Sequence, residues 1–169
     1  MENKILFAER QKFKQWWLWL LLLGINGMFV FGIFIKTVGS KVVVDNSTNN
    51  NPSIIGLGVV LLVTILFLLI KLETIVKEDG IYVRFIPFQI AYRKYAWEKI
   101  NKAFVREYSP IGEYGGWGFR YGIRNGKALN ISGNKGLQLI FTNNSRLLIG
   151  TNKMENLEYT LKQINQIKQ

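Results

Sequence analysis

The stretch WWLWLLLLGINGMFVFGIFI, residues 16–35, contains no charged side chain and only one strongly polar residue, Asn26. A second charge-free stretch, SIIGLGVVLLVTILFLLI, covers residues 53–70. An α-helix needs about 20 apolar residues to cross the hydrocarbon core of a bilayer, at a rise of roughly 1.5 Å per residue. The two stretches therefore predict a hairpin of two transmembrane helices, residues 16–35 and 53–71, followed by an extramembrane domain, residues 72–169.

Asn26 lies near the middle of the first predicted span, between Gly24 and Gly27. An amide in hydrocarbon is tolerated when it bonds to a neighbouring helix, and small residues let two helices approach closely. We expect these three residues to form a helix–helix contact, within the hairpin or between two copies of the chain. A transport path would call for charged or several polar residues in the spans, which the sequence does not supply.

Lysine and arginine are distributed unevenly around the predicted spans. The N-terminal tail, residues 1–15, carries four of them, the segment up to Arg84 after the second span carries three, and the loop 36–52 carries two. By the positive-inside rule, both termini are predicted in the cytoplasm of a multi-pass plasma-membrane protein. Basic and indole side chains that favour the membrane interface flank the spans: Lys14, Trp16, Trp17, Trp19, Lys36 and Lys71.

The composition narrows the chemistry available to the chain. It has no His and no Cys, so the commonest metal ligand, the usual general base near neutral pH and the thiol nucleophile are absent. We expect no metal, no cofactor and no catalytic activity. The segment from Lys71 onward contains 16 Lys and Arg and 8 Asp and Glu. This excess of positive charge suits binding to anionic surfaces, or it follows only from the membrane topology and from solubility.

After the second span the hydrophobic period changes from helical to two. Ile81, Val83 and Phe85 alternate with polar or amphipathic residues, which predicts a half-buried strand, and Asp79-Gly80 before it predicts a hairpin turn. Asn125-Gly126 offers a second tight turn. About seven short strands are predicted in an antiparallel barrel or sandwich: residues 73–77, 81–85, 88–95, 103–108, 116–121, 137–142 and 146–149, with a further alternation at 129–132.

The last segment returns to a helical period. Met154, Leu157, Leu161 and Ile164 fall on one face of a helix, with Asn152 placed as its N-cap and Glu155 as the partner at N3. The sequence therefore predicts an α+β domain that one C-terminal helix closes, either by plugging the end of the barrel or by binding a partner.

Six short segments resemble the pleckstrin-homology-like (PH-like) domains of small bacterial membrane proteins: residues 78–85 (EDGIYVRF), 96–100 (AWEKI), 106–110 (REYSP), 114–118 (YGGWG), 133–136 (GNKG) and 149–153 (IGTNK). The resemblance implies a β-barrel or sandwich of seven strands and a C-terminal helix over residues 73 to the end. Lipid-binding members hold phosphates with a basic loop between the first two strands. Here that turn is acidic, Glu78-Asp79-Gly80, so the resemblance assigns no inositol-phosphate site to it.

The segment from Tyr108 to Arg124 and the turn at Lys135 are the candidate binding region. Aromatic side chains interleaved with cations can stack on bases or lie at a lipid interface, and the tether makes anionic lipid the nearer ligand. The alternative is structural: the glycines supply positive φ, and Trp117, Phe119 and Tyr121 form one buried row. The candidate binding residues are Tyr108, Tyr114, Gly115, Gly116, Trp117, Arg120, Arg124 and Lys135.

These observations favour a membrane-embedded scaffold or adaptor whose tethered domain binds a protein partner or a second copy of itself. Two alternatives stay open: recognition of anionic lipid headgroups at the inner surface of the membrane, and an accessory subunit of a membrane enzyme or transporter. Glu107 and Glu113 are the acids nearest the glycine-rich segment, but they do not form a recognisable catalytic pair. The sequence carries no nucleic-acid-reading motif, so no nucleic-acid partner is expected.

Overall fold

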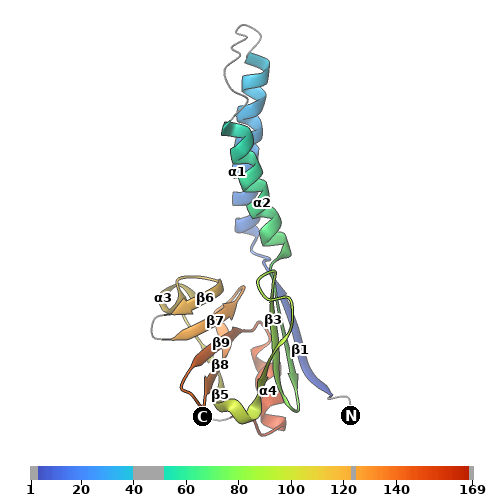
Figure 1. The fold of residues 1–169 in the computed structure, drawn as a ribbon, viewed down its shortest axis with the longest axis vertical. Helices are drawn as coiled ribbons and strands as arrows, with labels where there is room; N and C mark the ends of the chain where they lie inside the picture. The colour runs from blue at the N-terminus through green and yellow to red at the C-terminus, as the bar shows by residue number, and fades with distance from the viewer. Residues whose placement is uncertain (1–3, 40–51, 123–124, 168–169) are drawn as a thin grey trace. The chain divides into compact units, whose positions relative to one another are not determined.

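The computed structural model describes residues 4–39, 52–122 and 125–167. They divide into two compact units (Figure 1): a helical segment, Lys14–Leu69, and a domain that combines Met1–Phe13 with Ile70–Gln169. The fold is α+β, as predicted, with an apolar helix near the N-terminus and two β-sheets.

The helical unit contains α1 (Trp16–Gly39) and α2 (Pro52–Leu69). Within α1, Trp16–Val38 is long and apolar enough to cross a membrane, whereas the apolar stretch of α2, Ile54–Leu69, is shorter. Among the described residues, one helix therefore meets the length requirement, where two were predicted. Most of the predicted loop 36–52 lies outside the described residues, and Lys36 belongs to the last turn of α1.

Side chains in the middle of the two helices join them. The Asn26 amide nitrogen donates to Thr64 Oγ1 at 3.0 Å and to the Leu22 carbonyl at 2.7 Å. Gly24 and Gly27 face open space, so they do not bring α1 and α2 together, and their contact with a second copy of the chain stays a prediction. Gly56 instead allows the two helices to approach closely, because a Cβ there would lie 2.3 Å from the Phe29 ring. Of the predicted interface residues, Trp16 and Trp17 are exposed on the first turn of α1, Lys14 precedes it, and Trp19 is half-buried.

The first sheet is antiparallel and includes the N-terminal segment that the sequence predicted as a tail. Residues 5–12 form a strand because Phe7, Glu9 and Gln11 alternate onto its buried face. Lys71, expected at the end of a span, begins the next strand. The strand order is β1 (Ile5–Lys12), β2 (Lys71–Lys77), β3 (Gly80–Ile86) and β4 (Arg93–Ala96).

The two predicted hairpins are present, but their turn residues are shifted. Lys77 pairs with Gly80, so Glu78 and Asp79 form the first turn and Gly80 begins β3. Gly122 pairs with Gly126, which begins β7 instead of lying in the turn. Gly80 has a φ of 151°, and a Cβ there would lie 2.5 Å from the Tyr95 carbonyl oxygen, so no other residue fits without a shift.

The second sheet has five strands in the order β5-β8-β9-β7-β6. The sequence predicted a barrel or a sandwich, and the described strands form two separate sheets and no closed barrel, because β4 and β5 each end their own sheet and the 3-10 helix η1 (Trp97–Lys99) connects them. One pairing, β7 with β9, is parallel. The strands are β5 (Ile100–Glu107), β6 (Gly118–Gly122), β7 (Gly126–Asn130), β8 (Lys135–Phe141) and β9 (Arg146–Gly150).

Two short helices complete the domain, α3 (Pro110–Tyr114) and α4 (Met154–Gln163). In α4, Leu157 and Leu161 are buried, as the helical period predicts. The predicted N-cap is wrong: Lys153 occupies that position. Asn152 instead exchanges hydrogen bonds with the Ser132 hydroxyl through its side chain, while its backbone nitrogen donates to Glu9 at 2.8 Å.

Candidate anion-binding groove

The aromatic residues predicted to bind a ligand belong to the core of the domain. Tyr108 and Tyr114 are buried, with ring centroids 6.0 Å apart, and pack with Ala128 and Leu148. The Asn130 amide donates to the Tyr108 hydroxyl at 2.9 Å. Burial raises the pKa of both tyrosines. Their role is therefore to hold α3 against the five-stranded sheet.

Arg106, the basic residue two positions before Tyr108, has a partner within the chain. Its guanidinium makes a bidentate pair with Glu113, at 2.6 and 3.1 Å. Arg106 lowers the pKa of the Glu113 carboxyl, and the Ser109 backbone nitrogen adds a hydrogen bond to the same carboxylate at 2.9 Å. The pair ties β5 to α3 and leaves little net charge there to attract a ligand.

The remaining predicted residues are dispersed around these elements. Gly115, with a φ of 71°, ends α3, and Gly116 has a φ of 121°, which supports their structural role. Trp117 Nε1 donates to the Gly133 carbonyl at 3.0 Å, and Arg120 Nε donates to the Trp117 carbonyl at 3.0 Å. Lys135 is exposed at the start of β8, and Arg124 lies outside the described residues.

Strand β6 is an outer strand, and its aromatic side chains are not a buried row. Trp117, just before the strand, is half-buried, Phe119 is 49% exposed and Tyr121 is 71% exposed. The predicted row is therefore wrong. An alternating pattern indicates which residues share a face, but whether another element covers that face depends on the packing of the two sheets.

A basic groove lies elsewhere in the same domain, between β4, η1, the start of β7 and the turn that joins β8 to β9. Its volume is about 690 Å³. None of its lining residues in the described part of the chain is acidic. Five of them are cationic: Arg93, Lys94, Lys99, Lys127 and Arg146. We call this site the basic groove.

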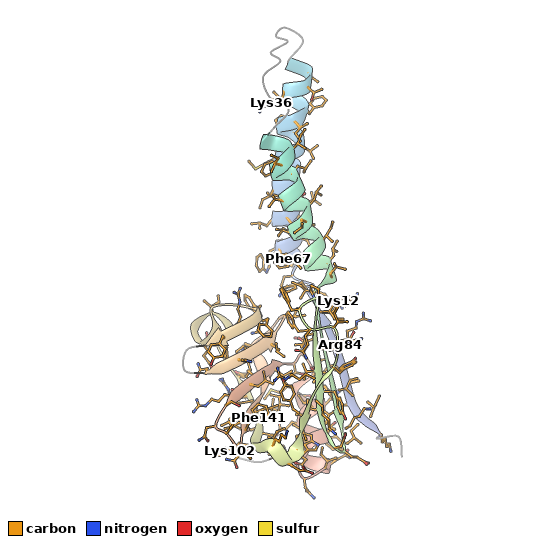
Figure 2. All side chains as sticks on the ribbon, viewed as in Figure 1. Lys12, Lys36, Phe67, Arg84, Lys102 and Phe141 are labelled. Carbon is orange, nitrogen blue, oxygen red and sulfur yellow. The ribbon has the colours of Figure 1, made fainter. Side chains whose placement is uncertain are left out.

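Aromatic rings form part of the groove wall. The Tyr95 and Phe141 centroids are 5.5 Å apart, and the Arg93 guanidinium lies 5.6 Å from the centre of the Tyr95 ring. Burial raises the pKa of Tyr95, so its hydroxyl stays neutral near pH 7. The exposed Tyr121 ring also lines the groove. In Figure 2, Phe141 lies on the same sheet as Lys102, a basic residue outside the groove.

One of the groove cations, Lys94, forms an ion pair with an acidic residue outside the groove. Its ammonium lies 2.5 Å from the Asp79 carboxylate, which also accepts from the Tyr82 hydroxyl at 2.7 Å. The hydrogen bond to Asp79 raises the pKa of Lys94, and the same contact lowers the pKa of Asp79. The acidic turn between β2 and β3 thus neutralises one groove cation from outside the groove.

The groove offers charge and hydrogen-bond donors for an anionic ligand. Guanidinium groups match carboxylate or phosphate geometry, ammonium groups act as point charges, and tyrosine rings provide contact area. Within residues 4–39, 52–122 and 125–167, acidic side chains do not gather in a group of three or more that could hold a metal ion. The arrangement is suited to binding anions.

The groove was not predictable from the sequence because its cations are scattered. Arg93 and Arg146 lie 53 positions apart, and each basic residue looks like an ordinary surface residue in its own segment.

Comparison with known proteins does not assign the chain to a family. No protein-family model matches it, and neither the curated proteins nor the solved structures include a match. The PH-like resemblance therefore stays a prediction.

Proposed function

We propose that this chain is a membrane-anchored, non-catalytic adaptor whose domain binds an acidic segment of a protein partner in the basic groove. The observation that carries the proposal is the convergence of five cations on a groove whose described lining residues include no acid. Side chains of one sign in a concave site concentrate the electrostatic field and attract a complementary charge.

The pairing of β1 with β2 supports a return crossing of the membrane. Lys12, which precedes α1, pairs with Lys71, which follows α2. Two strands in one sheet must lie on the same side of a bilayer. If α1 crosses, the chain must come back, and α2 is the apolar segment available for the return. Its 18 residues span about 27 Å, close to the roughly 30 Å of a typical hydrocarbon core.

The positive-inside rule then places the domain, with both termini, in the cytoplasm. The basic β1 segment and the strands after α2 carry the excess of Lys and Arg that the rule associates with the cytoplasmic side. Periplasmic or extracellular placement of the domain would contradict this part of the proposal.

The position of the groove along the strands favours a protein segment over the lipid headgroups. Lys71 pairs with Ile86 at the end of the sheet that connects to the helices, whereas Gly80 pairs with Ala96 at the opposite end, next to η1. Seven residues of β3 separate these ends, about 20 Å along an extended strand. The groove is built at the η1 end of the sheet, away from the chain connections.

The outer edge of β4 gives an extended segment a second means of attachment. β4 is the last strand of its sheet, and it contributes three consecutive residues, Arg93 to Tyr95, to the groove wall. Extended peptides commonly bind by adding a strand to such an edge, with side-chain pockets providing specificity. Acidic side chains on an added strand would face the groove cations.

Binding of a labelled polyglutamate peptide tests the groove. The full chain is placed in nanodiscs of zwitterionic lipid, and peptide binding is followed by fluorescence anisotropy at low and high salt. The double variant Lys99→Glu/Lys127→Glu is expected to weaken binding by about tenfold or more. The matched control Lys102→Glu/Lys153→Glu makes the same change of net charge at exposed positions outside the groove and should have a small effect.

Equal weakening by the two double variants would show that only net charge matters and would refute a groove site. Binding of anionic vesicles but not of the peptide would favour the lipid alternative. A photo-crosslinker placed at Tyr121, which is exposed in the groove wall, identifies the partner in native membranes. Crosslinks to the same chain alone would show self-association.

A further inference from the structure

Two exposed aromatic side chains lie against one buried ring, and a third exposed apolar side chain lies in the same loop as one of them. Phe88 and Ile90, in the loop between β3 and β4, are 64% and 75% exposed, and Phe119 on β6 is 49% exposed. Phe85 is fully buried, and its ring centroid lies 6.0 Å from that of Phe88 and 6.3 Å from that of Phe119. We call Phe88, Ile90 and Phe119 the apolar rim.

Hydrogen bonds hold the loop that carries most of the rim. The Gln89 backbone nitrogen donates to the Phe85 carbonyl at 2.7 Å, and its side chain donates to the Val83 carbonyl at 3.1 Å. Gln89 is therefore turned toward the sheet, while Phe88 and Ile90 on either side of it are turned outward. The loop presents two apolar side chains in a defined conformation at the cost of leaving them in water.

The register of the first sheet places this loop beside both connections to the helices. Ile86, the last residue of β3, pairs with Lys71, and Lys71 pairs with Lys12. Lys71 lies two residues after the end of α2, and Lys12 lies four residues before the start of α1. Lys12 and Arg84 both lie toward this end of the sheet (Figure 2).

Exposed apolar side chains next to lysines are typical of protein surfaces that insert into the interfacial region of a bilayer. Phenylalanine and isoleucine leave water for the acyl boundary, and lysines remain at the headgroups. The rim loop lies beside the two chain segments that continue into the apolar helices. Lipid is therefore the apolar medium nearest to the rim.

We propose that the apolar rim inserts into the interfacial region of the bilayer and so fixes the orientation of the domain on the membrane. The proposal rests on α1 and α2 lying in the membrane, and it is independent of what the basic groove binds. With the rim in lipid, the domain would be held by three attachments: two chain connections and the loop after β3.

The absence of cysteine from the chain allows a direct test with single nitroxide labels. Ile90→Cys labels the rim, and Glu98→Cys labels an exposed position in η1, outside the basic groove, as a matched control. Both full-length proteins are reconstituted in nanodiscs of phosphatidylcholine and phosphatidylglycerol. The Ile90 label should collide more with oxygen, which concentrates in lipid, than with a water-soluble nickel complex, and the Glu98 label should show the reverse.

Equal nickel accessibility at the two labels would overturn the proposal. Dipolar broadening at the Ile90 label that disappears on dilution with unlabelled protein would also overturn it, because a second copy would then cover the rim. A label at Ile90 combined with Phe88→Ser should raise the ratio of nickel to oxygen collisions by about threefold or more, since one of the anchoring rings is lost. An unchanged ratio would count against insertion.

Discussion

The two outer strands of the first sheet, β1 and β4, differ in how their side chains contact the rest of the domain. On β1, buried Glu9 accepts from Thr151 Oγ1 at 2.5 Å and from the Asn152 nitrogen at 2.8 Å, and the Gln11 amide donates to the Gly150 carbonyl at 2.7 Å. On β4, all four residues are exposed or half-buried, and three of them line the basic groove.

The difference separates a structural edge from one suited to binding. An unpaired strand edge is a template for another chain, so proteins usually cover it or make it unattractive. Here two buried side chains of β1 fasten the strand to residues about 140 positions away, whereas β4 is bordered by cations that would repel a second basic strand and attract an acidic one. Substitutions at Glu9, Glu113 and Asp79 test how these strands are held.

Removal of the Glu9 carboxylate should have the largest effect on stability. Glu9→Ala leaves the buried Thr151 hydroxyl and the part-buried Asn152 backbone nitrogen without their acceptor, which should lower the free energy of unfolding by about 2–3 kcal/mol. Denaturant unfolding of the full chain in micelles measures the loss. Glu98→Ala, at an exposed acid in η1, is the control and should change stability little. A similar loss in both variants would mean that β1 is not fastened by these bonds.

The stability that β5, an outer strand of the second sheet, gains from the ion pair between Arg106 and Glu113 should fall at acid pH. Because Arg106 lowers the pKa of Glu113 in the folded chain, the stabilisation is complete above the ordinary glutamate pKa of about 4.3 and is lost as the pH falls through the lowered value. Glu113→Gln should cost about 1 kcal/mol at neutral pH and should flatten this part of the acid profile. Unfolding curves recorded from neutral to acid pH measure both effects, and an unchanged profile would contradict the assignment.

The pair between Lys94 and Asp79 should affect binding rather than stability. The pair is exposed to solvent, so Asp79→Asn should leave the unfolding midpoint nearly unchanged. It should strengthen binding of the polyglutamate peptide by about twofold, because Lys94 no longer has a competing anion within the chain. Glu78→Gln alters the neighbouring acid in the same turn and serves as the control. Weaker binding of Asp79→Asn would show that the carboxylate itself supports the ligand site.

The regular parts of the fold were predictable because their signals are local. The apolar stretch of α1, the hairpin of β2 and β3 around Asp79-Gly80, and the buried stripe of α4 each follow from residues close together in the sequence. Strand β1 was not predictable in this way. Its inward positions include Glu9 and Gln11, polar residues that pattern reasoning assigns to solvent, and their partners lie at the other end of the chain.

The candidate binding site shows the same division. Aromatic and basic residues near Tyr108 and Trp117 suggested a ligand site, but the structure uses them for packing and for bonds within the domain. The cations of the basic groove, by contrast, come from separate segments, and no short motif joins them.

The apolar helix, the α+β character, the two hairpins and the excess of positive charge follow from the sequence, because burial periodicity and turn chemistry act over a few residues. Long-range packing is what makes residues 5–12 complete a sheet, keeps the described strands in two sheets, and brings Arg93 and Arg146 to one groove. Those outcomes depend on which distant segments pack together, and a contact between residues 50 or 140 positions apart leaves no mark in the pattern of either segment alone.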